Sequence, residues 1–228
     1  MIQTFEFEGG MTPAEATDTK ERILDAVEDL VGECGCDGTS VRMITEAAGV
    51  NVAAVNYHFG SKEELLVAAA GRISTTMNEA RVRMLRETEA RHAPDGPPVA
   101  EITRALIEPA FVAMSQAGDR ATARARFGAM ICSAPSEALQ ERIHECFRQS
   151  SDLIWDHLCR AVPDVGEEEM TSRYRGALAV MINATADTRN ANAMRTEAGR
   201  ERLLDHLVTF VASGFAAPPS GPTETDTG

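Results

Sequence analysis

The residues whose types and spacing could do chemistry lie between Thr39 and Lys62. From Val50 to Gly60 this run contains small and polar side chains and no acidic residue. An Asn side chain can bond to the edge of adenine, and an Ala methyl group can contact the methyl group of thymine. A carboxylate there would instead face DNA phosphates. The run therefore indicates a surface that contacts DNA, made of Asn51, Ala53, Ala54, Asn56, Tyr57 and His58.

Motifs of enzymes and of metal sites are not found in the sequence. The chain has no G-x-S-x-G, no P-loop and no H-E-x-x-H. The pairs His144–Cys146 and His157–Cys159 cannot chelate a metal alone, because helical residues two positions apart point about 200° away from each other. We therefore expect no enzymatic activity, no metal and no cofactor, with buried structural thiols at Cys132, Cys146 and Cys159.

The candidate surface must be positioned by helices. Apolar side chains recur at the helical period along almost the whole chain, which predicts an all-α fold with about nine helices. Pro109 lies inside one of them and predicts a kink or a break. The first helix is expected to begin near Asp18, and the others cover about 40–48, 52–57, 61–91, 99–117, 119–133, 136–161, 168–188 and 197–215.

The two short helices predict a helix-turn-helix with its core at 40–59. Each is too short to be stable by itself. Gly49 joins them, because glycine tolerates the positive φ of a tight connection. An apolar inner face on the first helix completes the pattern, with Val41, Ile44 and Ala48.

Composition divides the chain into four parts. Residues 1–16 are expected to be a flexible lead-in, because Gly9-Gly10 and Pro13 break any element. A helix-turn-helix domain is expected at 17–77, and a second helical domain at 78–216. Residues 217–228 have the Pro, Gly and Thr content of a disordered tail.

The block from Thr19 to Leu66 resembles the DNA-binding domain of the tetracycline-repressor (TetR) family. The run from Ala54 to Glu63 is especially similar to a subgroup that includes fatty-acid-responsive regulators. Asn51, Thr45 and Asn56 depart from the family's usual residues, so the operator sequence is not predicted. The positions in step with the family are Ile44, Ala48, Gly49, Val50, His58, Phe59, Ser61, Lys62, Glu63 and Leu65.

The resemblance implies a role for each matching position. Considered outside the motif, each of two residues has an alternative role. Tyr57 could instead cover the small hydrophobic core, and His58 could be a surface histidine whose hydrogen bonds are satisfied. The residues implied to contact phosphates or the DNA backbone are Thr39 or Ser40, Arg42, Tyr57, His58 and Lys62. Those implied to lie toward the bases are Asn51, Val52, Ala53, Ala54 and Asn56.

The resemblance also implies that 78–216 is a sensor and dimerisation domain. Helices near 168–188 and 197–215 could pair with those of a second copy, and packing within one chain is the alternative. An apolar ligand pocket is one interpretation of six residues, and ordinary core packing is the other: Phe111, Met114, Phe127, Met130, Trp155 and Met181. A small apolar effector, such as a fatty acid or acyl-CoA, follows from the subgroup resemblance alone.

The charge of the chain limits how it can bind DNA. The formal net charge of −13 argues against coating nucleic acid or an anionic membrane. Five basic residues accompany nine acidic ones between Thr19 and Arg72, so few phosphates can be neutralised and binding should depend weakly on salt. No apolar run reaches the roughly 18 residues of a transmembrane helix, and the cysteines show no disulfide framework, so a cytoplasmic protein is expected.

The sequence thus predicts a homodimeric DNA-binding transcription regulator. The expected mechanism is that of a repressor that a ligand releases from a pseudo-palindromic, double-stranded operator. One alternative is a regulator that responds to redox state or metal through its cysteines. Another is a helical interaction module that does not bind DNA.

Overall fold

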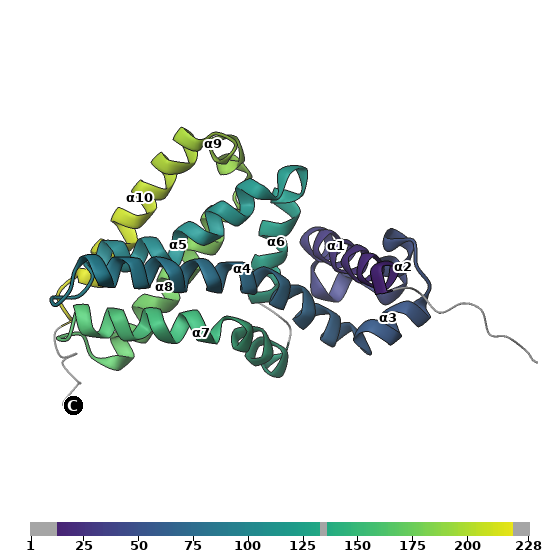
Figure 1. The fold of residues 1–228 in the computed structure, drawn as a ribbon, viewed down its shortest axis with the longest axis horizontal. Helices are drawn as coiled ribbons and strands as arrows, with labels where there is room; N and C mark the ends of the chain where they lie inside the picture. The colour runs from purple at the N-terminus through teal and green to yellow at the C-terminus, as the bar shows by residue number, and fades with distance from the viewer. Residues whose placement is uncertain (1–12, 133–135, 221–228) are drawn as a thin grey trace, which may run out of the picture.

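The structure is a computed structural model, and it describes residues 13–132 and 136–220. Within this part the fold is all-α, as predicted, with ten α-helices and two single 3₁₀ turns at Gly118–Arg120 and Thr188–Asn190. The helices are α1 Pro13–Gly38, α2 Val41–Ala48, α3 Val52–Phe59, α4 Lys62–Arg91, α5 Val99–Gln116, α6 Ala121–Cys132, α7 Glu137–Ala161, α8 Glu167–Ala186, α9 Ala191–Met194 and α10 Glu197–Ala216 (Figure 1).

Side-chain caps explain several helix starts. The hydroxyl of Ser61 accepts a hydrogen bond from the Glu64 amide at 3.1 Å and begins α4 where the sequence predicted. Ser136 and Thr196 cap α7 and α10 in the same way. A capping oxygen satisfies an amide that the first helical turn leaves unpaired. These caps fix the chain positions from which the long helices run.

Two helix boundaries differ from the prediction. α1 begins at Pro13 rather than near Asp18, because proline is tolerated in the first turn, where its missing N–H is not needed. The short α9 was not predicted, since four residues carry no readable period. Residues 1–12 of the predicted lead-in and 221–228 of the predicted tail lie outside the described part of the chain.

α5 runs without a break through Pro109, so of the predicted kink or break the break does not occur. Proline removes the N–H that would bond to the Ala105 carbonyl. At the next residue the Leu106 carbonyl accepts two hydrogen bonds from the buried Arg81, from Nε at 3.1 Å and from Nη2 at 3.0 Å. These donors from α4 stabilise the turn at which the helix loses one of its own.

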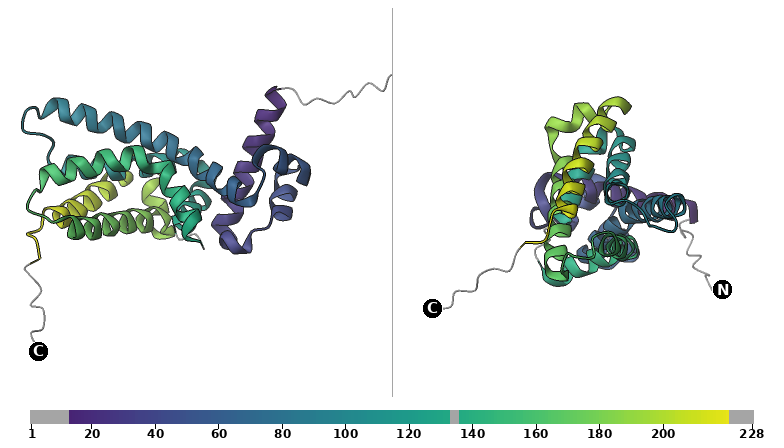
Figure 2. Two further views of the ribbon diagram at one scale, coloured as in Figure 1. Left: turned by 90° about the horizontal axis from the view of Figure 1, so that it is seen from below. Right: turned by 90° about the vertical axis from the view of Figure 1, so that its left-hand side faces the viewer.

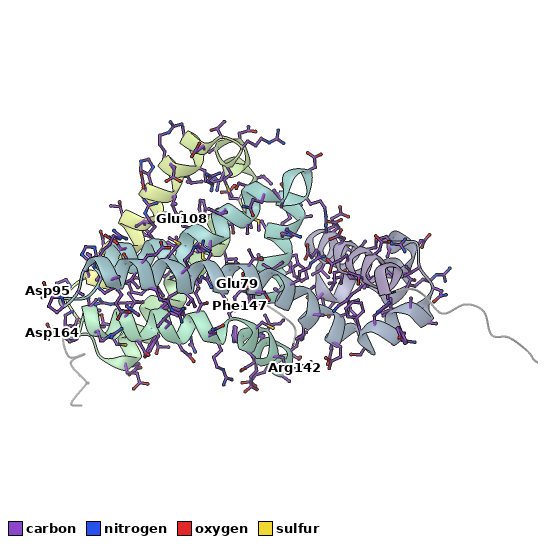
Figure 3. The ribbon with its side chains drawn as sticks, in the orientation of Figure 1. Glu79, Asp95, Glu108, Arg142, Phe147 and Asp164 are labelled. Atoms are coloured by element: carbon purple, nitrogen blue, oxygen red, sulfur yellow. The ribbon has the colours of Figure 1, made fainter. Side chains whose placement is uncertain are left out.

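The helices enclose two hydrophobic cores. The smaller core joins α1–α4 to α6 and the start of α7, and Val27, Ile44 and Phe127 are among its fully buried side chains. The larger core lies among α4, α5, α7, α8 and α10. Figures 1 and 2 show α1–α3 at one end of an elongated molecule, with α4 extending from them along the helical bundle. Ile73 and Phe147 pack against both cores; Phe147 is labelled in Figure 3.

None of the helices in the described residues combines the length and the apolar character needed to cross a membrane.

Candidate nucleic-acid interface

The turn between α2 and α3 is closed by backbone hydrogen bonds. Gly49 adopts φ 65° and ψ 38°, the left-handed conformation that glycine enters without strain. The Val50 amide bonds to the Thr45 carbonyl at 3.0 Å, and the Gly49 amide bonds to the Glu46 carbonyl at 3.2 Å. This is a Schellman motif, which ends α2 and directs the chain into α3. The predicted helix-turn-helix core is therefore present in the fold.

α3 has one buried face and one open face. Val55 and Phe59 are buried in the smaller core, so the predicted inner residues are confirmed. Tyr57 is 79% exposed and Val52 is 48% exposed, although both side chains are large enough to be buried elsewhere. Exposed large apolar and aromatic groups on one helix face mark a contact surface. The other exposed residues of this face are Asn51, Ala53 and Asn56.

Two of the predicted base contacts have additional structural roles. The Asn51 side-chain oxygen accepts a hydrogen bond from the Ala54 amide at 2.9 Å and caps α3, so only its NH₂ group is left to donate to a partner. Ala54 is half-buried and packs against the smaller core. Asn56 remains fully available on the open face. The most accessible part of the helix is therefore formed by Val52, Ala53, Asn56 and Tyr57.

The predicted phosphate contacts are not equally accessible. Thr39 is buried and its hydroxyl donates to the Gly35 carbonyl at 2.8 Å, so it presents no hydroxyl to solvent. Ser40 and Arg42 are exposed, and Ser40 caps α2 through the Met43 amide. The Lys62 ammonium donates to the Cys36 carbonyl at 2.5 Å, which holds the start of α4 against the end of α1.

Tyr57 and His58 lie side by side with ring centroids 5.1 Å apart. The exposure of Tyr57 rules out its alternative role as a cover for the small core. His58 is half-buried, and its Nε2 is buried without a hydrogen-bond partner, so it is not a satisfied surface histidine. An unpaired nitrogen beside an exposed phenol is consistent with a surface that is completed by a ligand.

α1 holds the helix-turn-helix from behind. The Arg22 guanidinium donates to the Ala48 carbonyl at 3.3 Å, at the negative end of the α2 dipole. Thr45, which departs from the family's usual Ala, is buried and its hydroxyl donates to the Arg42 carbonyl at 2.9 Å. The buried hydroxyl is therefore satisfied, and this departure does not disturb the fold.

A buried carboxylate joins the DNA-binding end to the rest of the molecule. Glu28 on α1 is fully buried, and Arg72 of α4 donates to it from Nη2 at 2.6 Å and from Nε at 3.1 Å. Arg124 of α6 donates at 3.0 Å, and Arg120 lies 3.5 Å away. Removing one member of a buried ion cluster costs about 3–5 kcal/mol. Glu28 therefore fixes α1 relative to both α4 and α6.

The rim of this cluster is also acidic. Asp25 accepts from Arg72 at 2.9 Å and is paired with Arg120 at 2.5 Å. Burial opposes its ionisation, but the two guanidinium groups hold the pKa of Asp25 below its ordinary value. Three arginines from three segments are thus committed to acids of α1. Arg72 is consequently unavailable for DNA phosphates.

Glu28 and Arg81 were not predicted from the sequence, although each carries a signal. Glu28 falls on the buried face of α1, four residues after Leu24, and Arg81 lies midway between the buried Met77 and Leu85 of α4. A charged residue at a helical position that the apolar period predicts to be buried is the pattern of a buried ion. The period does not reveal which residues pair with this ion, because they come from distant helices.

The six predicted ligand-pocket residues do not form one group. Phe111, Met114 and Met181 are buried in the larger core, and Trp155 packs against it. Phe127 belongs to the smaller core, and Met130 is 43% exposed. A polar surface pocket at the start of α8 contains none of them and is lined by Glu167, Glu168, Thr171, Ser172 and Arg175.

The cysteines are dispersed through the fold. Cys146 and Cys159 are half-buried, whereas Cys132 is exposed, contrary to the expectation that it is buried. Burial raises the pKa of the Cys36, Cys146 and Cys159 thiols, which lowers their thiolate fraction and hence their reactivity. Among the described residues no three His, Cys, Asp or Glu side chains are grouped so that they could hold a metal ion.

Known regulators resemble this chain in sequence. The transcriptional repressor AcnR of Corynebacterium glutamicum is 35% identical over 63 residues, which are 28% of this chain and 34% of AcnR. The transcriptional dual regulator CecR of Shigella flexneri is 34% identical over 88 residues, 39% of each chain. The matched segments thus span little more than a third of these relatives' length.

Solved structures share the fold over most of the chain. The regulator PfmR of Thermus thermophilus matches with a TM-score of 0.58 and 19% identity, over 84% of this chain and 97% of PfmR. The regulator FadR of Bacillus subtilis, solved in complex with stearoyl-CoA, matches with a TM-score of 0.59 and 17% identity, over 85% of this chain and 98% of FadR. At these identities the likeness concerns the fold.

Two family models together account for most of the chain. The model of bacterial regulatory proteins of the tetR family matches residues 23–69, which contain the helix-turn-helix. The model of the tetracyclin repressor-like C-terminal domain matches residues 104–214, from α5 to α10. Both matches agree with the fold and with the exposed face of α3, and the chain belongs to the TetR family of DNA-binding transcriptional regulators.

Proposed function

We propose that this protein is a dimeric repressor that binds a pseudo-palindromic operator through α3 and is released from it by a small ligand. The observation that carries the proposal is the open face of α3, where Tyr57 and Val52 are exposed beside Asn56 and no acid is present. A helix with such a face can enter the major groove. A cytoplasmic location follows from this proposal, because the DNA that it would bind lies there.

The outer faces of α8 and α10 support dimerisation. Phe210 on α10 is 68% exposed, which is unusual for a large apolar side chain on a bundle helix. Small exposed residues lie on the same two helices and allow a second copy to approach closely: Gly176, Ala179, Ser213 and Gly214. A two-fold dimer would present two copies of α3 about one DNA turn apart.

Ligand release requires that the effector bind one arrangement of the dimer better than the other. The larger core contains four of the six predicted ligand residues, in or packed against it. The Glu28 cluster supports coupling, because it ties α1 to α4 and α6. The bound stearoyl-CoA of B. subtilis FadR supports an apolar effector for a protein of this fold. Residues 17–77 and 78–216 would then be the DNA-binding and the sensor domains.

The proposal can be tested with the full-length protein and genomic DNA fragments. Fragments enriched by binding, including DNA upstream of the protein's own gene, would be measured by fluorescence anisotropy against scrambled DNA. We expect sequence-specific binding by the wild type. The double variant Asn56→Ala, Tyr57→Ala should lose that specificity while keeping its thermal stability, because both side chains are exposed.

Arg148→Ala is the matched control, since Arg148 is an exposed residue of α7 whose ion-pair partner is Glu145 on the same helix. It should bind DNA as the wild type does. Failure to enrich any genomic fragment would contradict the proposal. Equal binding by the double variant would show that α3 is not the recognition helix.

A further inference from the structure

A positive charge without a counter-ion lies inside the larger core. Arg81 of α4 is 2% exposed, and in the described part of the chain no carboxylate lies within 4.0 Å of its guanidinium. Buried charges in proteins are normally paired, because removing an ion from water costs several kcal/mol. Glu28 follows this rule because arginines pair with it, whereas Arg81 has no such ion pair.

The neighbours of Arg81 are neutral. Apart from the Leu106 carbonyl of α5, its Nη1 approaches the Ser150 hydroxyl of α7 at 3.4 Å and its Nη2 approaches the Met181 sulfur of α8 at 3.8 Å. Both distances are long for hydrogen bonds. Nη1 of the guanidinium is therefore only weakly satisfied, whereas Nη2 also donates to the Leu106 carbonyl at 3.0 Å. Ser150 in turn donates to the Asn78 side-chain oxygen at 2.6 Å.

A second buried polar group lies on α8. The Tyr174 hydroxyl makes no hydrogen bond of good geometry, and Ser151 is the side chain that approaches it. After burial, the electrostatic interaction between Tyr174 and Arg81 contributes to the pKa of both residues. Burial raises the pKa of Tyr174, so the phenol stays protonated and can donate. A buried cation that lacks a counter-ion, together with a buried O–H donor that interacts with it, forms a site for an anion.

The surroundings define the rest of the ligand. Arg81 of α4 contacts residues of α5, α7 and α8. The larger core, to which these helices contribute, contains Ile107, Phe111, Ile154 and Leu158. Methionines such as Met77 and Met181 can change shape to admit an apolar chain. Met181 and Trp155, two of the predicted ligand residues, flank the pair, and the Trp155 ring lies 5.9 Å from that of Tyr174.

We propose that Arg81 and Tyr174 bind the carboxylate of an effector that is a free monocarboxylic acid with an apolar chain. This inference rests on the proposed function, because the acid is taken to be the small ligand that releases the repressor from DNA. A coenzyme A thioester fits less well, because its acyl end carries no anion and its phosphates would not reach a buried guanidinium without being buried themselves. The carboxylate of a free acid would supply the negative counter-ion that Arg81 lacks.

The test measures binding without DNA, by the fluorescence of Trp155, which is the single tryptophan of the chain and contacts Tyr174. The probes are octanoate, dodecanoate and hexadecanoate, each compared with its methyl ester, its alcohol and its coenzyme A thioester. We expect at least one acid to bind about tenfold or more tightly than its methyl ester and its alcohol, which are neutral, and than its coenzyme A thioester, whose anionic phosphates lie far from the acyl end. Each bound acid should also raise the melting temperature.

Two variants separate a ligand role from a structural one. Arg81→Gln keeps a donor for the Leu106 carbonyl and removes the charge, so it should abolish the preference for the acid over the ester. Tyr174→Phe removes one hydroxyl only and should weaken acid binding severalfold with ester binding unchanged, which keeps the test valid if the first variant does not fold. Arg148→Gln, an exposed arginine on α7, should change nothing.

Each contrary result overturns the inference: no acid binds, the ester binds as tightly as the acid, or Arg81→Gln or Tyr174→Phe retains the full preference for the acid. The outcome is distinct from that of the operator experiment. Specific DNA binding without acid binding would support the repressor proposal and overturn the acid-binding proposal. Acid binding through Arg81 without DNA binding would support the acid-binding site and contradict the repressor proposal.

Discussion

At the scale of single residues, the DNA-facing surface depends on what each polar side chain is already bonded to. Lys62 is a predicted phosphate contact and Arg72 is a nearby cation, but both donate to groups of α1. Arg42 is exposed and has no ion pair within the described residues. Proximity in sequence to the helix-turn-helix is therefore a poor guide to which cations are available for DNA.

We predict that Arg42→Ala weakens binding to operator and to scrambled DNA by the same factor, because a phosphate contact carries no sequence information. In a dimer the slope of log K against log salt concentration should become shallower by about two, one for each lost contact. Anisotropy titrations at several salt concentrations measure both effects. A loss confined to the operator would place Arg42 against the bases instead.

At the scale of helices, the sequence predicted eight of the ten described α-helices closely, because apolar periods and caps such as Ser61 are local signals. It misplaced the start of α1, and of the kink or break predicted at Pro109 the break does not occur, where Arg81 donates to the neighbouring Leu106 carbonyl. The packing of α1 on α6 could not be predicted, since no local pattern specifies which distant helix covers a face.

The contact between α1 and α6 depends on Gly32. A Cβ atom there would lie 2.4 Å from the Ala123 carbonyl oxygen, so the two backbones must separate if one is added. Gly32→Ala should lower the free energy of unfolding by about 1–3 kcal/mol and loosen the Glu28 cluster. Urea unfolding measures the change.

Gly128→Ala on α6 is the control, because a Cβ there meets nothing within 4 Å. It should raise the free energy of unfolding by up to about 1 kcal/mol, as alanine favours helix. Equal effects of the two substitutions would mean that α1 and α6 are not closely packed in solution.

The proposed dimer face on α8 and α10 makes a further prediction. Phe210→Glu should convert the dimer to monomers, since it would place a charge in an apolar interface. Met130→Glu adds the same charge at another exposed apolar residue, on α6, and should leave the dimer intact. Sedimentation equilibrium measures the association state. A wild-type protein that is already monomeric at micromolar concentration would refute the dimer.

At the scale of the whole molecule, an acidic protein must bind an acidic polymer. The net charge is −13, and the cations nearest the helix-turn-helix are largely paired with α1. Backbone amides, helix N-termini and groove contacts must then provide much of the binding energy. General repulsion should also suppress non-specific binding.

We therefore predict a shallow salt dependence for operator binding. If each dimer neutralises about two to four phosphates, the slope of log K against log salt concentration is about −2 to −4. Anisotropy between low and physiological salt measures it. A slope of about −7 or steeper would show that many more basic side chains reach phosphates than the structure presents.

The central claim is that a dimer presents two copies of α3 to successive major grooves, and operator spacing tests it most directly. Binding would be measured by anisotropy to the selected operator, to one with half a helical turn inserted between its half-sites, and to a single half-site. The account predicts tight binding to the first alone, because half-sites must lie about one turn, or whole turns, apart on one face of the DNA. Equal affinity for all three would contradict it.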